Sequence, residues 1–253
     1  MLRISYFGIS NFLVEHGGVR ILIDPCFSEN PMTSVRATDV PCDLVLVTHG
    51  GKDHLGDAVE LMLANPGARL YAPADVATHA LRHGVDSART FRMVPGAQRE
   101  DGGVRIKAVQ AVHISFTRSD DIYLTGVPLG FILTLGSLRL YHTGDTCLFS
   151  DFRLIGEFYK PDVMLVPVGK FPGAVTEMEP WEAAQAAAWV NPALCIPMHW
   201  DPLTQGDYPA LFASELRTRA AADRPVVRQI PFDRAIALDE QGVVQGEGPW
   251  RST

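Results

Sequence analysis

The stretch that decides the fold begins with the run Asp43-Leu-Val-Leu-Val-Thr48 and continues directly into His49-Gly-Gly-Lys-Asp-His54. A short, continuously apolar run of this kind is typical of a strand that is buried on both faces. The turn after it carries two histidines and an aspartate, and a helix is expected from there to about residue 64, where Asn65-Pro66-Gly67 ends it. The strand therefore delivers imidazole and carboxylate groups to one loop, the kind of place where folded proteins display functional groups.

Three further segments share this design of a strand that leads into a histidine or an aspartate. Strands expected over about 103–112, 137–142 and 194–198 are followed by His113, Asp145 and His199. Any one of these residues is equally well explained as part of a surface pair, but the segments are harder to dismiss together. Imidazole and carboxylate suit Zn²⁺, Mn²⁺ or Fe, so a mixed nitrogen and oxygen ligand set is available from Asp53, His54, Asp145 and His199.

The composition is that of an ordinary soluble, folded protein. Of 253 residues, 47% are hydrophobic and 20% are charged, which excludes a disordered, collagen-like or disulfide-scaffold chain. No apolar run approaches the ~20 residues of a membrane helix. The first residues are typical of a strand rather than a signal segment, so a cytoplasmic protein is expected. The net charge of −7 gives no basic surface for nucleic acid, and the cysteines, without a C-x-x-C pair, are expected to be free thiols.

The rest of the chain mixes strands with helices and shows no repeat, low-complexity tract or linker. Hairpins are expected near the N-terminus and over 129–142, and the polar segments 27–40 and 115–127 are expected to be loops. Helices are expected near 74–83, 149–159, 180–189 and 208–222. This pattern predicts a single α/β domain over residues 1–253, with sheets covered by helices.

The motif Thr48-His-Gly-Gly-Lys-Asp-His-Leu-Gly56 resembles the H-x-H-x-D-H signature of the metallo-β-lactamase-fold superfamily. The other motifs of that superfamily match in the same order, at Ile23-Asp24-Pro25, His113, Tyr141-His-Thr-Gly-Asp-Thr146 and Pro197-Met-His199. The resemblance covers nearly the whole chain. Within the superfamily, the chain looks most like the branch of cytosolic metal-dependent hydrolases that includes the ascorbate-6-phosphate lactonases.

The resemblance implies an αββα sandwich, in which two mixed β-sheets are flanked by helices and two metal sites lie in a cleft at one edge. It also implies the metal ligands: His49 and His113 for the first metal, Asp53, His54 and His199 for the second, and Asp145 as the bridge between the two. Asp24 and His142 are expected to support these ligands rather than to bind metal. Asp53 is in addition the expected catalytic residue.

Gly51 stands where the superfamily has the second histidine of its signature, so the first site lacks one ligand. A second departure is Gly8-Ile9-Ser10, where this branch commonly has a histidine after the glycine. Three readings follow: a hydrolase with one ion at the intact second site, a two-ion enzyme whose weaker first site is completed by water or substrate, or a degenerate protein without turnover. Lys52 is expected to be a solvated residue at a helix start, and the alternative is that its ammonium takes the place of the missing cation.

The expected function is that of a metal-dependent hydrolase with one ion, Zn or Mn, with Fe and a second ion left open. A bound metal lowers the pKa of its water toward ~7 and so supplies hydroxide, while Asp53 orients that water and accepts its proton. The lactonase resemblance favours a small ester or lactone among the substrates that suit this chemistry. The expected partner is a small molecule, not nucleic acid or membrane, and a homo-oligomer is left open. The alternatives are a ligand-binding or interaction module on the same fold and, less favoured, a phosphodiesterase or nuclease.

Several other residues have weaker claims to a role. Cys147 lies close after Asp145 and is open to a role as ligand, although packing against a helix is the favoured reading. His79 and His83 have the i,i+4 spacing that can hold a metal but also arises by chance on a surface helix. The loop 170–176 is expected at the edge of the cleft, and nearby aromatic residues are expected to form substrate-pocket walls: Phe116, Tyr123, Phe171 and Trp200.

Overall fold

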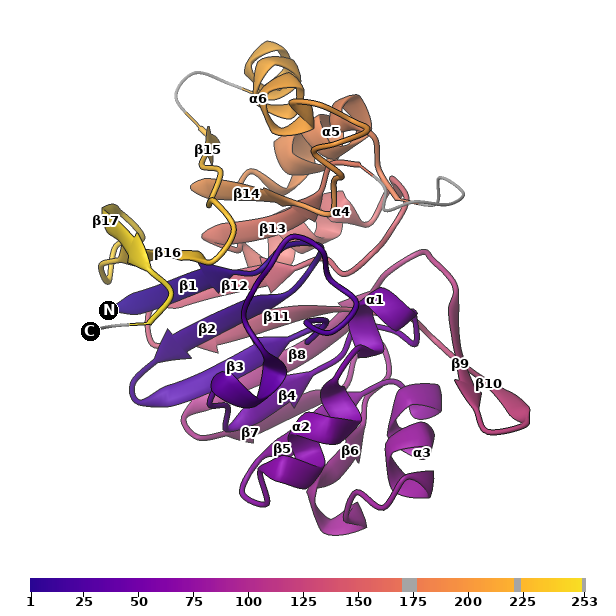
Figure 1. Cartoon of the computed structure of the whole chain (residues 1–253). Coiled ribbons are helices and arrows are strands. Elements are labelled where there is room, and N and C mark those ends of the chain that lie inside the picture. Colours follow the sequence, from indigo (N-terminus) through magenta and orange to yellow (C-terminus); the bar gives the residue numbers. More distant parts are fainter. Residues whose placement is uncertain (170–176, 221–223, 252–253) are drawn as a thin grey trace.

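The computed structural model describes residues 1–169, 177–220 and 224–251, and within these ranges the chain forms two large β-sheets (Figure 1). The first sheet has the order β17 (Val244–Pro249), β16 (Arg234–Leu238), β1 (Leu2–Tyr6), β2 (Phe12–His16), β3 (Val19–Ile23), β4 (Leu44–Leu46), β5 (Arg69–Ala72) and β6 (Thr90–Arg92). The second has the order β15 (Val226–Val227), β14 (Leu194–Met198), β13 (Val163–Pro167), β12 (Leu138–His142), β11 (Leu129–Leu135), β8 (Val104–Gln110) and β7 (Gln98–Asp101). Each sheet contains parallel and antiparallel pairs, which confirms the expected mixed sheets.

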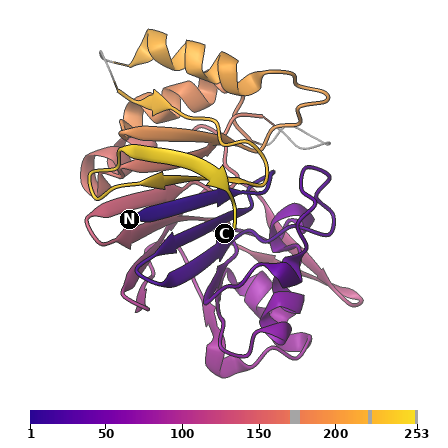
Figure 2. The ribbon, with the colours of Figure 1, turned by 60° about the vertical axis from the view of Figure 1, so that its left-hand side comes forward.

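Helices cover both sides of the sandwich, as Figures 1 and 2 show. On the side of the first sheet lie α1 (Lys52–Leu55), α2 (Ala58–Ala64) and α3 (Ala74–Arg82), with the short 3₁₀ turns η1 (Ala37–Asp39) and η2 (Ser87–Arg89). On the side of the second sheet lie α4 (Phe152–Leu154), the π-helical turn η3 (Ile155–Tyr159), α5 (Pro180–Val190) and α6 (Tyr208–Arg219). Because α5 packs on β13 and against α6, the layer order is helix, sheet, sheet, helix, and the predicted αββα sandwich is confirmed.

The strand β4 shows why the apolar run at 43–48 predicts this architecture. Leu44 and Leu46 belong to the core between the two sheets, whereas Val45 and Val47 belong to the cluster formed with α2 and α3. Since successive side chains of a strand point to opposite faces, a run without polar residues has to be buried on both. β4 is therefore a central strand, and it holds the histidine-bearing turn against the sandwich.

The structure corrects several of the expected elements. Residues 115–127 do not form a loop but the hairpin of β9 (Ser115–Ser119) and β10 (Ile122–Gly126), which projects from the sandwich beside α3 (Figure 1). The polar strands β7 and β17 were not expected, and both lie at sheet edges, where few apolar residues are needed. The helix expected up to residue 64 is interrupted at Gly56, whose φ of +42° and close approach to Cys26 leave no room for a side chain.

The structure also describes the cysteines and the length of the helices. The four cysteines are free, with three of them buried and Cys147 half-buried. Among the helices in the described ranges, none is long and apolar enough to cross a bilayer.

Candidate metal centre

The expected ligands meet because the strands before them end at one edge of the sandwich. β12, β13 and β14 run parallel, and β8 shares their direction because both β8 and β12 are antiparallel to β11. The turns after β8, β12 and β14, which carry His113, Asp145 and His199, therefore share an edge. The first sheet reaches the same edge through β4, since the carbonyl of Thr48 accepts a hydrogen bond from the backbone N–H of Leu129 at 2.9 Å.

Three overlapping groups of side chains among the described residues bring their ligand atoms within 4.8 Å of one another. They are His49, His54 and Asp145; Asp53, His54 and His199; and His113, Asp145 and Glu177. All of the ligands named from the sequence fall in these groups. Glu177 is the member that sequence reasoning missed. Glu177 does not directly follow a strand. The sequence signal that could have pointed to it is its position just before a helix that carries further acidic residues.

The atoms of the second site converge on one carboxylate oxygen. Oδ2 of Asp145 lies 3.0 Å from Nε2 of His54 and 3.1 Å from Nε2 of His199. Oδ2 of Asp53 lies 3.8 and 3.5 Å from the same two nitrogens. The side chains of His54, Asp145 and His199 are 0%, 3% and 2% exposed, whereas that of Asp53 is 31% exposed. The site therefore has a dry interior and one ligand at its mouth.

This arrangement fits a divalent cation. Nε2 of His54 and Nε2 of His199 are buried and make no hydrogen bond of good geometry. Buried polar atoms without partners are costly and uncommon, and here they belong to side chains that are metal ligands by chemical type. Two imidazoles and two carboxylates make a donor set for Zn²⁺, Mn²⁺ or Fe²⁺, so the residues present can hold such an ion.

Charge coupling within the site is strong. Burial alone would lower the pKa of His54, but Asp145, Asp24 and Asp53 outweigh it and place that pKa well above its usual value. The same competition raises the pKa of His199 to about 10. Burial would raise the pKa of Asp145, but His199 and His54 hold it well below its usual range. Without a cation, the two imidazoles therefore favour their protonated forms and the Asp145 carboxylate stays ionised, so binding of a cation displaces protons.

Asp24 fixes the orientation of His54. Its Oδ2 lies 2.7 Å from Nδ1 of His54 and accepts a hydrogen bond from Thr48 Oγ1 at 2.8 Å, while its Oδ1 accepts from the Thr48 backbone N–H at 2.7 Å. An ionised carboxylate only accepts hydrogen bonds, so Nδ1 of His54 is the protonated nitrogen and Nε2 faces the site. Asp24 supports a ligand and is not itself in any of the three groups.

The backbone of the segment around Ile9 forms hydrogen bonds with His199 and His142. The backbone N–H of His199 donates to the carbonyl of Ile9 at 2.8 Å, and both residues have left-handed backbones, with φ of +58° and +54°. A β-branched residue rarely adopts such a φ. His142 has its Nε2 3.1 Å from the carbonyl of Ser10, and its Nδ1 accepts from the N–H of Gly144, directly before Asp145. Ile9 and Ser10, where the branch commonly has a histidine, therefore offer buried backbone carbonyls as hydrogen-bond acceptors to His199 and His142.

The space left by the missing side chain at Gly51 is narrow. The backbone there is ordinary, with a φ of −58°, but a Cβ atom would lie 2.7 Å from Nε2 of His49 and 3.1 Å from Oδ1 of Asp53. The His49 ring lies between those of His54 and His113, with ring centroids 4.1 and 4.8 Å apart. Burial and the neighbouring His54 lower the pKa of His49 to about 3, which leaves a neutral imidazole.

The remaining sequence candidates lie apart from these groups. Lys52 is exposed at the start of α1, in agreement with the solvated reading. Cys147 is in none of the three groups, and His79 and His83 lie at the C-terminal end of α3, with their rings tilted against each other and the centroids 4.1 Å apart. Trp200 is wrong as a pocket wall because it is buried and packs against Tyr6 and Phe232. Phe171 and the loop 170–176 lie outside the described residues, and Phe116 and Tyr123 are exposed on the β9–β10 hairpin.

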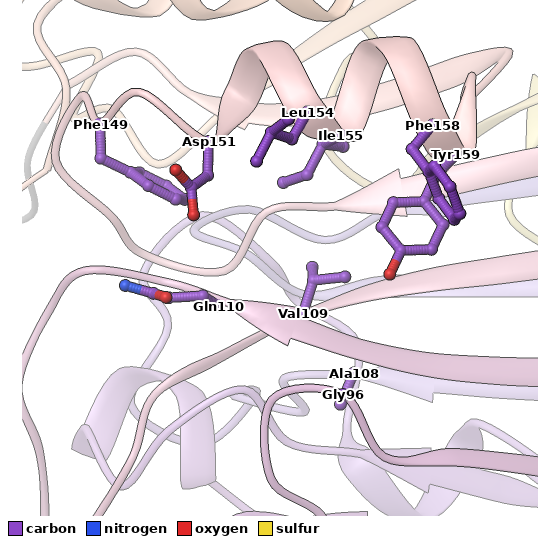
Figure 3. Close-up of a pocket in the computed structure, with 10 residues that line it drawn as sticks. All are labelled: Gly96, Ala108, Val109, Gln110, Phe149, Asp151, Leu154, Ile155, Phe158 and Tyr159. Atoms are coloured by element: carbon purple, nitrogen blue, oxygen red, sulfur yellow. The ribbon is translucent and has the colours of Figure 1, made fainter.

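An apolar groove of about 350 Å³ lies elsewhere on the molecule, between β8 and the segment 149–159 (Figure 3). Figure 3 shows Leu154, Ile155 and Phe158 extending from the helical turns over the strand that carries Val109. No member of the three ligand groups lines this groove. Its shape and apolar lining therefore say nothing about the metal chemistry.

Comparison with known proteins agrees with this geometry. The family model described as the beta-lactamase superfamily domain matches residues 19–200. A UPF0173 metal-dependent hydrolase of Methanopyrus kandleri is 40% identical over 200 residues, which cover 79% of this chain and 84% of the relative. A UPF0173 metal-dependent hydrolase of Opitutus terrae is 40% identical over 225 residues, which cover 85% of this chain and 92% of the relative. The solved structure of Igni18, a metallo hydrolase from Ignicoccus hospitalis, has a TM-score of 0.76 at 30% identity and covers 91% of this chain and 95% of its own. The chain belongs to the beta-lactamase superfamily and, within it, to the UPF0173 family of metal-dependent hydrolases.

Proposed function

We propose that this protein hydrolyses a small ester or lactone with one divalent ion, Zn or Mn, held at the second site by Asp53, His54, Asp145 and His199. The observation that carries the proposal is the convergence of the His54 and His199 Nε2 atoms on Oδ2 of Asp145, with both nitrogens buried and without a hydrogen bond of good geometry. The family supports the hydrolase chemistry, and resemblance to the lactonase branch supports the choice of ester or lactone.

Each side chain of the site has a distinct part in this chemistry. A bound divalent ion would lower the pKa of water in the site and polarise the substrate's carbonyl group, which makes the carbonyl carbon more electrophilic. Asp24 holds His54 in the tautomer that directs Nε2 into the site. Asp53, the most exposed of the ligand side chains at the second site, lies where it can orient the attacking water and accept its proton. The buried Asp145 and His199 exclude bulk water from the other side of the site.

The proposal also covers the setting of the reaction. It takes the substrate to be a small molecule and the protein to act in the cytoplasm, without nucleic acid or membrane as partner. The net charge of −7 supports the exclusion of nucleic acid, since a polyanion would be repelled. Assembly into a homo-oligomer is compatible with the proposal and is not required by it.

The test is metal content, followed by hydrolysis. Protein purified without chelator and incubated with Zn²⁺ or Mn²⁺ is expected to retain at least one ion per chain and to hydrolyse members of a panel of nitrophenyl esters and small lactones. His199→Ala and Asp145→Ala are expected to lose the second-site ion and the activity, whereas His49→Ala keeps that ion. Near-zero occupancy in the wild type after incubation with Zn²⁺, Mn²⁺ and Fe²⁺ would overturn the proposal, and so would loss of the only ion in His49→Ala with retention in His199→Ala.

Gly51 favours one alternative, a protein that keeps the fold and binds a ligand without turnover. The glycine removes a side chain that the superfamily signature places in the site, and the Cβ position lies only 2.7 Å from His49. Stoichiometric metal binding without hydrolysis of any ester, lactone, amide or phosphodiester tested would support this alternative over the hydrolase.

A further inference from the structure

We infer that Glu177 is a metal ligand of the first site and replaces the histidine that Gly51 removes from the signature. The first site then consists of His49, His113, Glu177 and the shared Asp145. This inference rests on the proposed function, because it adds a second ion to the metal centre described above.

The placement of Glu177 is the first argument. Its carboxylate forms a ligand group with His113 and Asp145 whose atoms lie within 4.8 Å of one another, and its Oε1 is 4.0 Å from Nε2 of His113. The side chains of Glu177 and His113 are each only 7% exposed. Carboxylates are rarely this buried unless they are paired or coordinate a metal. Glu177 is thus a buried acid directed at a residue that the superfamily resemblance assigns to the first metal.

The atoms around it supply a second, independent observation. Nδ1 of His113 and Oδ1 of Asp145 are buried and make no hydrogen bond. Oδ2 of Asp145 already faces His54 and His199. A carboxylate that gives one oxygen to each of two cations uses both of its atoms, so the unpartnered Oδ1 is the oxygen left for a second ion.

The backbone that directly follows Glu177 is anchored. Met178 is fully buried in the core between the sheets. At the start of α5, Glu179 and Glu182 form a capping box, in which the N–H of Glu179 donates to Glu182 Oε2 at 3.1 Å. Two residues of the chain directly after Glu177 are therefore fixed by packing and by capping. The carboxylate can serve a cation without the ordering cost of a free loop.

The chemistry of the replacement makes a prediction about the metal. A carboxylate in place of an imidazole adds a negative charge and a hard oxygen donor, which favours Mn²⁺ and Fe²⁺ relative to Zn²⁺. Gly51 itself has an ordinary backbone, and a Cβ atom there would lie 2.7 Å from Nε2 of His49. We expect the first site to prefer Mn²⁺ more strongly than the second site does.

The test is the stoichiometry and magnetic state of bound Mn²⁺ in the full chain. The wild type is expected to bind two ions that share Asp145 and give an exchange-coupled electron paramagnetic resonance signal. Glu177→Gln, which keeps the shape and removes the charge, is expected to bind one ion with the signal of an isolated Mn²⁺, or to bind the second ion at least tenfold more weakly. Glu157→Gln is the control, since it removes an exposed charge outside the three ligand groups and should leave both ions in place.

The outcomes separate this inference from the proposed function. One ion in the wild type and the same single ion, with unchanged affinity, in Glu177→Gln overturns the role of Glu177 but leaves the second-site hydrolase intact. Two ions in both proteins with equal affinities also overturns it. No ion in the wild type overturns both proposals. Circular dichroism and the thermal unfolding midpoint show whether Glu177→Gln is folded, and Glu177→Asp, which retains a carboxylate, should bind the second ion more tightly than Glu177→Gln does.

Discussion

At the scale of single residues, Asp24 shows how the centre is built from its supports as well as its ligands. It is completely buried, has a left-handed φ of +48°, and accepts hydrogen bonds from Thr48 and His54. Aspartate and asparagine tolerate this backbone better than other side chains except glycine. Its conformation and its contacts therefore both depend on a short polar side chain at this position.

Substitution of Asp24 is expected to separate stability from metal affinity. Asp24→Ala leaves the N–H groups of Thr48 and His54 without acceptors and should reduce the free energy of unfolding by roughly 3–5 kcal/mol. Asp24→Asn keeps an acceptor for Thr48 and should cost less. Its amide N–H₂, however, favours the His54 tautomer with the proton on Nε2, so metal affinity should fall by about 10–100-fold. Urea unfolding and metal titration measure the two effects.

A buried aspartate away from the site gives the control for this prediction. Asp57 accepts hydrogen bonds from the backbone N–H groups of Phe27 and Ser28 and belongs to none of the three ligand groups. Asp57→Ala should lower the free energy of unfolding while the metal dissociation constant of the folded protein stays unchanged. Equal loss of metal affinity in Asp57→Ala and Asp24→Asn would contradict the tautomer argument.

The residues of the candidate site could be predicted from the sequence where a side chain able to bind metal directly follows an apolar strand. Asp53, His54, Asp145 and His199 follow apolar strands, and side chains at the ends of neighbouring parallel strands meet at one edge. Glu177 could not be found in this way, because it precedes a helix and does not lie at the end of a strand. Trp200 was misassigned for a related reason, since an aromatic residue beside a ligand can point toward the core as easily as toward a cleft.

At the scale of elements, the β9–β10 hairpin has an inverted pattern that hides it from sequence reasoning. Ser115, Thr117 and Ser119 are buried, whereas Phe116 is 45% exposed between them. The usual alternation in a half-buried strand places apolar residues inside. Here the inner face contacts α3 and the buried carboxylate of Asp75, so small hydroxyl side chains fit better than apolar ones. The polar residues of 115–127 therefore suggest a loop when the sequence is considered alone. The packing of β9 against α3 explains why this segment is a strand.

Ser115 links this hairpin to the metal-binding turn, and its removal should be costly. Its Oγ donates to Asp75 Oδ2 at 2.6 Å and accepts from the Gly50 N–H at 3.0 Å. Ser115→Ala strands both buried partners and should lower the free energy of unfolding by about 1–3 kcal/mol. Ser137→Ala, which removes an exposed hydroxyl bonded to the carbonyl of Glu240, should change it by less than about 0.5 kcal/mol. Similar values for the two variants in urea unfolding would show that the link contributes little.

At the scale of the whole molecule, the residues of the candidate metal centre come together only because two sheets meet at one edge. Asp53 and His54 come from the turn after β4 in the first sheet, and Asp145 and His199 follow strands of the second. The core between the sheets contains residues from both ends of the chain, including Leu2, Leu133 and Ile236. The apolar runs predicted that such layers exist, but they did not predict the strand order, because β16 and β17 join β1 from the far end of the sequence.

This shared core predicts that the chain unfolds as one domain and that metal stabilises all of it. Thermal unfolding followed by far-ultraviolet circular dichroism and by tryptophan fluorescence should give one coincident transition. Metal at a hundred times its dissociation constant contributes about 2.7 kcal/mol by mass action, which for a chain of this size raises the midpoint by roughly 5–10 °C. Asp145→Ala should show the single transition without the shift, because the ligand shared by both sites is gone. Two separate transitions, or an equal shift in Asp145→Ala, would contradict the view that one cooperative core and one metal centre belong together.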